Sequence, residues 1–241
     1  MQLVDLRQQR DRGLLAQFIQ LYERTFEAPE LREDPALWLG RMWGDAPEPA
    51  PIVHIIVAVD GSGRQVIGGV VCEYYRASGC GLVTYLVVTP TTRRTGIGRQ
   101  LVSCAAATLR TQAAVHGRPL QAVFAEAADP ARLPSSNGGT EPGERLSALA
   151  RLGARRVDIP YVQPDLGGGA GRVEGLWLLS MGVAPQEELP GPVLRAFLHE
   201  FYRSLGVADP DADADFQGMI ARVNESVSLS TLQPRGKTDE W

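Results

Sequence analysis

The residues with the clearest chemical signature stand at a corner between a strand-like run and a helix-like run, in the stretch LVVTPTTRRTGIGRQLV at 86–102. Three arginines and two glycines fall close together there: Arg93, Arg94, Gly96, Gly98 and Arg99. The first amides of a helix have no intrahelical acceptor, and the positive end of the helix dipole lies beside them. Glycines let phosphate oxygens approach those amides, and arginines add charge-assisted hydrogen bonds. The corner therefore predicts a site for a phosphate or pyrophosphate group.

Two common phosphate-binding motifs fit this corner poorly. A P-loop ends in Gly-Lys-Ser/Thr, and no such sequence follows Gly98. A dinucleotide fingerprint needs a third glycine near position 101, which is leucine, and Glu126 comes later than the usual acidic residue. The alternative without a ligand is that the glycines pack a helix onto a sheet while the arginines are solvated.

The corner and its flanks resemble the coenzyme A-binding motif of the GNAT superfamily of N-acyltransferases, Arg/Gln-x-x-Gly-x-Gly/Ala. The motif reads Arg93-Arg94-Thr95-Gly96-Ile97-Gly98 in this chain. The upstream strand carries the matching Leu-x-Val-x-Pro run, at Leu86, Val88 and Pro90. The order of elements is similar to this fold from about residue 3 to 183.

The resemblance implies an α/β fold with a mixed, mostly antiparallel central sheet flanked by helices. Local patterns agree: apolar spacing predicts a first helix at about 12–26, and Asp60-Gly61-Ser62-Gly63 predicts a hairpin. The predicted order is ααβββαβαββ, followed by a helical tail. We expect a GNAT domain at 1–184 and a C-terminal helical extension at 185–241, packed on or next to the same domain.

The resemblance also implies how a thioester donor, acetyl-CoA, would bind. Backbone amides around Arg94 to Arg99 would hold the pyrophosphate. A bulge in the strand at Leu86 to Val88 would bind the pantetheine arm and polarise the thioester carbonyl. The predicted coenzyme-binding residues are therefore Leu86, Val87, Val88, Arg93, Arg94, Thr95, Gly96, Ile97, Gly98 and Arg99.

Direct attack by an amine requires a base for the ammonium proton and often an acid for the leaving thiolate. Many relatives carry a tyrosine four residues before the glycine that closes the helix after the fifth strand. That glycine is matched by Gly153, and the tyrosine position holds Leu149, which cannot donate a proton. Tyr161 or solvent is left to protonate the thiolate. Glu126 is the predicted base, with two alternatives on neighbouring strands, Glu73 and Tyr85.

Composition limits the other function classes. The chain has 241 residues, 44% of them hydrophobic, and a net charge of −4, which argues against a general nucleic-acid-binding surface. Its three cysteines and three histidines show no metal-ligand spacing, so we expect no metal site. The sequence contains no apolar run long enough for a signal peptide or a membrane-spanning helix. We therefore expect a cytoplasmic protein with no membrane partner.

Other patterns have two interpretations each. DPDADAD at 209–215 is similar to the start of an EF-hand loop, but Ala214 and Ile220 replace its glycine and bidentate glutamate, so we predict a linker and helix N-cap. GGGAG at 167–171 predicts a loop over the acceptor pocket or a long hairpin connection. The proline of YVQPDL ends a strand and fixes where Tyr161 and Gln163 point, toward an acceptor or at a structural corner. Aromatic residues could line an acceptor pocket or pack in the core: Trp38, Trp43, Tyr74 and Tyr75.

These observations favour an enzyme that transfers an acetyl group from acetyl-CoA to a primary amine, with a small molecule favoured over a protein. One alternative is a coenzyme A-binding regulatory module with weak or no catalysis, because Leu149 replaces the usual tyrosine. Another is transfer of a longer acyl group. The acceptor itself is set by variable loops, and a monomer and a homodimer are both compatible with the sequence.

Overall fold

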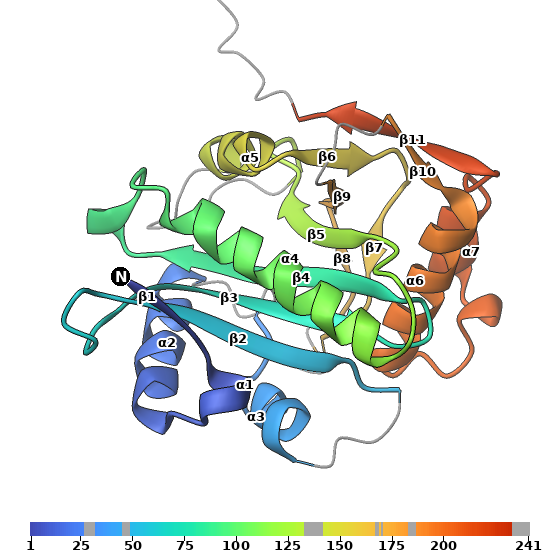
Figure 1. Ribbon diagram of the computed structural model, residues 1–241. Helices are drawn as coiled ribbons and strands as arrows, with labels where there is room; N and C mark the ends of the chain where they lie inside the picture. The colour runs from blue at the N-terminus through green and yellow to red at the C-terminus, as the bar shows by residue number, and fades with distance from the viewer. Residues whose placement is uncertain are drawn as a thin grey trace, which may run out of the picture. The chain divides into compact units, whose positions relative to one another are not determined.

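The computed structural model describes residues 1–26, 32–44, 49–132, 142–166, 169, 171–182 and 187–232. The chain forms two compact units, Met1–Gln121 and Ala122–Trp241, which we call the N-terminal and C-terminal units (Figure 1). Each unit combines helices with strands, and every strand pairing described within either unit is antiparallel. The predicted α/β class, mostly antiparallel and flanked by helices, is confirmed.

The N-terminal unit contains four strands in the order β1-β2-β3-β4. These are β1 (Gln2–Asp5), β2 (Ile52–Val59), β3 (Val66–Tyr75) and β4 (Cys80–Val88). The predicted hairpin at Asp60 joins β2 to β3, where the Asp60 carboxylate accepts hydrogen bonds from the Arg64 and Gln65 amides. The strand β1 and the short helix α1 (Leu6–Gln9) were not expected from the sequence. Four residues of alternating burial are too short a pattern to predict a strand.

Helices cover both faces of the N-terminal strands. A Cβ atom on Gly69 of β3 would lie 2.6 Å from the ring of Phe18 in α2 (Arg12–Thr25). One on Gly68 would lie 3.4 Å from the side chains of Ile97 and Leu101 in α4 (Ile97–Val115). Because successive strand residues point to opposite faces, α2 and α4 pack on opposite sides of β3. The helix α3 (Pro35–Trp43) adds Trp38 and Met42 to the core on the α2 side.

The C-terminal unit contains five strands in the order β5-β9-β6-β11-β10 and a separate pair, β7 and β8. Their bounds are β5 (Val123–Ala128), β6 (Ala154–Val157), β7 (Val162–Gln163), β8 (Val173–Glu174), β9 (Leu176–Met181), β10 (Glu188–Pro190) and β11 (Ser226–Thr231). The helices are α5 (Pro142–Arg151), α6 (Gly191–Ser204) and α7 (Ala214–Ile220). Phe124 of β5 stacks on Phe197 of α6, with ring centroids 4.3 Å apart, so α6 covers the strand that carries Glu126.

The C-terminal extension contains the two predicted helices, α6 and α7, and also two strands. β11 pairs with β6 through Leu229 and Val157, so the extension adds strands to the sheet as well as helices. Burial alternates along Ser226–Thr231, but six residues are too few for such a pattern to predict a strand from the sequence. The predicted domain limit at residue 184 falls within 183–186, outside the described residues, and stays a prediction. None of the helices in the described part of the chain has the length and apolar character needed to cross a membrane.

Candidate active site

The predicted coenzyme corner begins where β4 ends, and threonines tie it to the neighbouring strand. The Thr89 amide donates to the carbonyl of Ile67 at 3.0 Å. A 3₁₀ turn follows at Pro90–Thr92, and the Thr92 hydroxyl lies 2.7 Å from that of Thr89 and 3.3 Å from the same Ile67 carbonyl. The loop is therefore fixed to the end of the sheet before the glycines begin.

The backbone of the corner adopts the conformations of an anion-binding turn. Arg94 has φ 65° and Gly96, the N-cap of α4, has φ 89°, both in the left-handed region. Alternation of left-handed with ordinary conformations turns successive amides toward one side and forms a concave anion site. Inside the helix, the Gln100 amide donates to the Gly96 carbonyl at 3.1 Å. The amides of Ile97 and Gly98 precede it, in the first turn, where helix amides have no intrahelical acceptor.

The two motif glycines have different reasons to be glycine. Gly96 needs its positive φ, which side chains other than glycine rarely adopt. Gly98 has ordinary helical geometry, and a Cβ there would meet only a Val88 methyl, at 3.9 Å. The described packing therefore leaves Gly98 enough room for a side chain. Open space beside the first amides of a helix is what close approach of a phosphate requires.

The charge around the corner has one sign. Arg93, Arg94 and Arg99 are exposed. From Tyr74 to Ala125 the sequence contains no aspartate or glutamate, although the whole chain has a net charge of −4. The same stretch holds six arginines: Arg76, Arg93, Arg94, Arg99, Arg110 and Arg118. This distribution gives the N-terminus of α4 a local positive potential that the bulk composition conceals.

The strand before the corner differs from the expectation in one detail. Leu86, Val87 and Val88 pair regularly with Val70, Gly69 and Gly68 of β3. The register shift lies upstream, because Tyr85 pairs with Val71 and Val83 with Cys72. Thr84 is the extra residue, and its hydroxyl donates to the Val71 carbonyl at 3.2 Å. The bulge expected at Leu86 to Val88 is thus placed at Thr84 with respect to β3.

The two residues predicted for catalysis contact each other. Glu126 is the fourth residue of β5, paired with Leu178 of β9, and its side chain is half-buried. Tyr161 lies directly before β7 and is 6% exposed. The Tyr161 hydroxyl donates a short hydrogen bond to a carboxylate oxygen of Glu126. Both positions differ from the expectation that each residue ends a strand, since β5 continues to Ala128 and Tyr161 precedes β7.

The backbone beside Tyr161 is held in place by two residues of the C-terminal extension. The Tyr202 hydroxyl of α6 donates to the Val162 carbonyl at 2.7 Å. The Val162 amide donates to the Met219 sulfur of α7 at 3.4 Å. Burial raises the pKa of Tyr202; Arg172 opposes the rise, and the charges of Asp213, Asp215 and Glu126 add to it. Tyr202 therefore acts as a neutral donor that fixes this segment.

Comparison with known proteins supports the resemblance. Residues 15–126, which include the corner and end at Glu126, match the model of the Acetyltransferase (GNAT) family. The predicted GNAT resemblance is therefore confirmed for this part of the chain. Its fold is similar to that of a protein from Bacteroides thetaiotaomicron described as a GNAT acetyltransferase, with a TM-score of 0.53 and 14% identity over 77% of this chain and 89% of that one.

Two further solved structures are less similar in shape. A tandem GNAT protein from the clavulanic acid biosynthesis pathway is 27% identical, with a TM-score of 0.46, and matches 67% of this chain. The match spans 46% of that protein's length. The aminoglycoside 6'-N-acetyltransferase from Enterococcus faecium is 16% identical over 77% of this chain and all of its own, with a TM-score of 0.44. A search of curated proteins finds no match.

Within the GNAT frame, Leu149 occupies the position expected from the sequence. It lies in α5, two residues before the helix ends at Arg151, and Gly153 beyond the end has φ 87°. A positive φ just after a helix is the usual reason for a closing glycine. The helix and its closing glycine are therefore present, and the match of Leu149 to the family's tyrosine stays a prediction.

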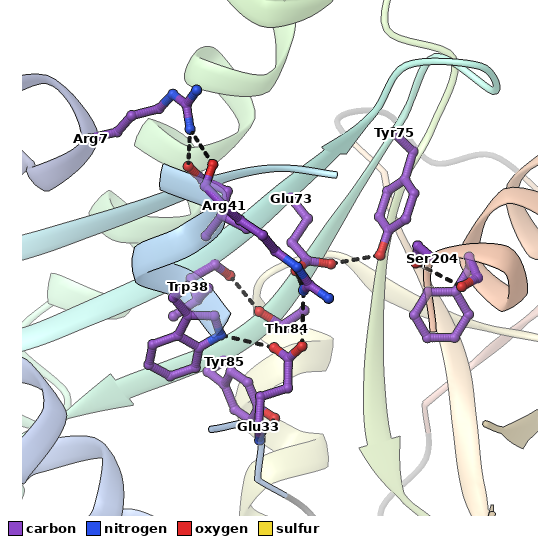
Figure 2. A network of polar contacts seen from close by, with 12 residues as sticks. Arg7, Glu33, Trp38, Arg41, Glu73, Tyr75, Thr84, Tyr85 and Ser204 are labelled. Atoms are coloured by element: carbon purple, nitrogen blue, oxygen red, sulfur yellow. Dashed lines mark hydrogen bonds and ion pairs between the residues drawn. The ribbon is translucent and has the colours of Figure 1, made fainter. Parts of the chain in front are cut away.

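The alternative bases, Glu73 and Tyr85, belong to a buried network of the N-terminal unit (Figure 2). The Glu73 carboxylate accepts hydrogen bonds from Arg41 at 3.1 Å and from the Tyr75 hydroxyl at 2.6 Å. The Tyr85 hydroxyl accepts one from the Glu33 amide at 3.0 Å. Burial and then the charge of Glu33 raise the pKa of Tyr85, so this phenol stays protonated at neutral pH. These contacts give both residues structural roles, and the choice of Glu126 as the base stays a prediction.

The other members of this network were not predictable from the sequence. Arg41 lies between two carboxylates, 3.1 Å from Glu33 and 3.1 Å from Glu73. The Trp38 indole nitrogen donates to Glu33 at 2.9 Å (Figure 2). Glu33 and Arg41 come from the chain before β2, far in sequence from Glu73, and no local pattern connects them. For Trp38 the packing interpretation is confirmed, since it is fully buried beside Phe18, Tyr22 and Tyr85.

The acidic stretch 209–215 has the structural role expected for it. The Asp213 side chain accepts from the amides of Asp215 and Phe216 and so caps α7. Both Asp213 and Asp215 also bind the Arg172 guanidinium. Hydrogen bonding from Arg172 lowers the pKa of Asp213 to about 2.

Of the glycine loop, residues 167, 168 and 170 lie outside the described residues. In the described ranges no group of three His, Cys, Asp or Glu residues could hold a metal ion.

Proposed function

We propose that this protein transfers an acetyl group from acetyl-CoA to a primary amine of a small molecule, by direct attack of the amine on the thioester. The observation that carries the proposal is the corner before α4. It combines left-handed turns at Arg94 and Gly96, unfilled space at Gly98 and exposed arginines. The match of residues 15–126 to the GNAT family supports acyl-CoA-dependent N-acyltransfer in general. The proposal goes further than this general activity in two respects: the transferred acyl group is acetyl, and the acceptor is a small-molecule amine.

The proposal assigns the pyrophosphate of coenzyme A to the amides of residues 97–99 and to the neighbouring arginines. Charge-assisted hydrogen bonds from guanidinium groups to phosphate are about twice as strong as neutral ones. Backbone amides of β4 would polarise the thioester carbonyl, since donors aimed at a developing negative charge stabilise the transition state. No enzyme nucleophile is required for this reaction.

The Glu126–Tyr161 pair would move the protons. The amine nitrogen forms a bond to the thioester carbon while Glu126 takes one of its protons. When the carbon–sulfur bond breaks, Tyr161 donates its hydroxyl proton to the thiolate and recovers a proton from Glu126 along their hydrogen bond. The amine proton thus ends on coenzyme A, and both side chains return to their starting state. This relay would take the role of the tyrosine that many relatives carry at the position of Leu149.

Calorimetric titration of wild type and Gly98→Val with acetyl-CoA, coenzyme A and NAD tests the donor site. The side chain at 98 has room in the folded protein, so we expect unchanged circular dichroism and at least about a tenfold loss of affinity for acetyl-CoA and for coenzyme A. Gly40→Val is the matched control, because Gly40 of α3 has equal room and lies outside the motif. Unchanged coenzyme affinity in Gly98→Val, or binding of NAD alone, contradicts the proposal.

The second candidate is a coenzyme A-binding regulatory module without turnover, which Leu149 favours. Transfer of a longer acyl group is a third. Both are separated from the first by a turnover assay with acetyl-CoA, butyryl-CoA and octanoyl-CoA against a panel of primary amines. Tight coenzyme binding without thiol release from any thioester would support the regulatory module. Preference for octanoyl-CoA would support a longer acyl group.

A further inference from the structure

The segment that carries Tyr161 receives little support from strand pairing. Tyr161 lies outside the strands, and its amide donates to the carbonyl of Ile159 at 3.0 Å, two residues earlier in the chain. The strand β7 that follows contains only Val162 and Gln163, and within the described residues it pairs with β8 alone. Two short strands without a third are marginally stable by themselves. Another part of the chain must therefore fix the position of Tyr161.

Two side chains of the C-terminal extension occupy the edge of β7 that has no neighbouring strand. The Tyr202 hydroxyl of α6 donates to the Val162 carbonyl at 2.7 Å, and the Met219 sulfur of α7 accepts from the Val162 amide at 3.4 Å. Tyr202 and Met219 are fully buried, and the hydroxyl lies 4.0 Å from the sulfur. The backbone groups of Val162, directly after Tyr161, are thus both held by α6 and α7.

The helix α6 also packs on the strand that carries Glu126. The ring of Phe197 stacks on Phe124 of β5, with centroids 4.3 Å apart. Residues two positions apart in a strand project to the same face, so Phe124 and Glu126 share the face that α6 covers. Five residues separate Phe197 from Tyr202, a rise of about 7.5 Å along the helix. One helix therefore connects the strand of Glu126 with the segment of Tyr161.

We propose that Tyr202 is a positioning residue for the proton relay, and that its hydrogen bond to the Val162 carbonyl holds the Tyr161 hydroxyl against Glu126. This inference rests on the proposed acetyl transfer. Tyr202 moves no proton itself. Proton transfer requires hydrogen-bond distances, and a misplacement of about 1 Å can lower a rate by as much as about 100-fold. The extension, which lies beyond the match to the family model, thereby takes part in catalysis.

Tyr202→Phe tests this role, because it removes the hydroxyl and keeps the ring that packs on Phe216, with centroids 5.4 Å apart. With acetyl-CoA and the best amine, kcat should fall by about three- to tenfold, whereas KM and calorimetric affinity for acetyl-CoA should stay unchanged. Met219→Leu removes the sulfur acceptor at similar volume and should lower kcat by at least about twofold.

Ser204→Ala is the matched control on the same helix. The Ser204 hydroxyl also donates to a backbone carbonyl at 2.7 Å, but this carbonyl belongs to Phe201 of α6 itself. Its loss should leave kcat at the wild-type value. Assays run well below the lowest Tm of the set separate a change in kcat from unfolding of the variants.

The double variant Tyr161→Phe/Tyr202→Phe decides whether Tyr202 acts through Tyr161. If it does, kcat should lie within about twofold of Tyr161→Phe alone, since the misplaced hydroxyl is already absent. If Tyr202→Phe does not fold, Met219→Leu combined with Tyr161→Phe provides the same comparison.

Three results would overturn the inference while leaving acetyl transfer intact. These are a wild-type kcat in Tyr202→Phe, losses that multiply in the double variant, and an equal loss in Ser204→Ala. A raised KM for acetyl-CoA at constant kcat would also overturn it, because the hydroxyl would then act on coenzyme binding. Wild type that binds acetyl-CoA but acetylates no amine overturns the proposed function, and this inference with it.

Discussion

The hydroxyl of Tyr161 donates a short hydrogen bond to the carboxylate of Glu126, across 35 residues of sequence. Both side chains lie in the C-terminal unit, Glu126 on β5 and Tyr161 directly before β7. The bond fixes the direction of the carboxylate and gives it a proton donor at hydrogen-bond distance. Two polar side chains with a purely structural role would also form this hydrogen bond. Kinetic measurements on variants therefore have to distinguish a catalytic role from a structural one.

A double-mutant cycle on this pair tests the proton relay. Glu126→Gln should lower kcat by about 100-fold or more, and Tyr161→Phe by about tenfold, because each removes one step of the relay. The double variant should be no slower than Glu126→Gln, since residues that act as a unit are not additive. Steady-state kinetics with acetyl-CoA and the best amine provides all four values.

The control for this cycle is Glu174→Gln, an exposed glutamate of β8 in the same unit, which should leave kcat unchanged. Calorimetry should find acetyl-CoA affinity unaffected in every variant of the cycle. Strictly additive losses, or a Glu126→Gln enzyme as fast as wild type, would remove the pair from catalysis.

Arg94 combines a strained backbone with a charge, and two substitutions separate these properties. Arg94→Gly removes the guanidinium and relieves the left-handed φ of 65°, so it should stabilise the fold by about 0.5–1 kcal/mol. Arg94→Ala keeps the unfavourable conformation and should be less stable than Arg94→Gly. Both should weaken coenzyme A binding by about three- to tenfold at low salt, measured by calorimetry, and by less at high salt.

Arg64→Ala supplies the comparison for Arg94, since Arg64 is exposed in the β2–β3 hairpin. It should change neither affinity nor its salt dependence. If the Arg64 and Arg94 variants bind coenzyme A equally well, the guanidinium of Arg94 makes no contact with the phosphates.

Arg41 is expected to be essential for the stability of the N-terminal unit. Its guanidinium lies between Glu33 and Glu73, whose side chains are 5% and 3% exposed. Arg41→Met leaves two buried carboxylates without their cation, and breaking a buried pair in this way costs about 3–5 kcal/mol. Urea unfolding followed by circular dichroism measures the loss. A cost below about 1 kcal/mol would mean that water reaches the two carboxylates.

The stability of the C-terminal unit should depend on pH through Asp213. Arg172 lowers the pKa of this carboxyl in the folded state to about 2. Its usual value is about 3.9, so the ion pair stabilises the fold above that pH and is lost as pH falls toward 2. Arg172→Gln should therefore lower Tm at pH 6 and leave it nearly unchanged near pH 2. A constant difference between wild type and variant across this range would show that Arg172 acts by packing alone.

The sequence by itself determined the coenzyme corner, because every part of that feature is local. A strand, a turn with glycines, and a helix N-terminus follow one another within 86–102, and the left-handed backbone conformation needed at Gly96 belongs to that residue alone. The hairpin at Asp60 and the closing glycine at Gly153 were predictable for the same reason. Short elements such as β1 and β11 were not, since four to six residues carry too little periodicity.

Only the tertiary structure decided which distant side chains meet. Nothing local joins Arg41 to Glu73 or Tyr202 to Val162, because burial and partners depend on how separate segments pack. Glu126 and Tyr161 were each identified from the sequence, yet their hydrogen bond follows from the positions of β5 and β7 in the folded unit. Local chemistry thus fixed the donor site in advance. The hydrogen bond of the proposed proton-transfer pair depends on long-range packing, which a linear pattern does not encode.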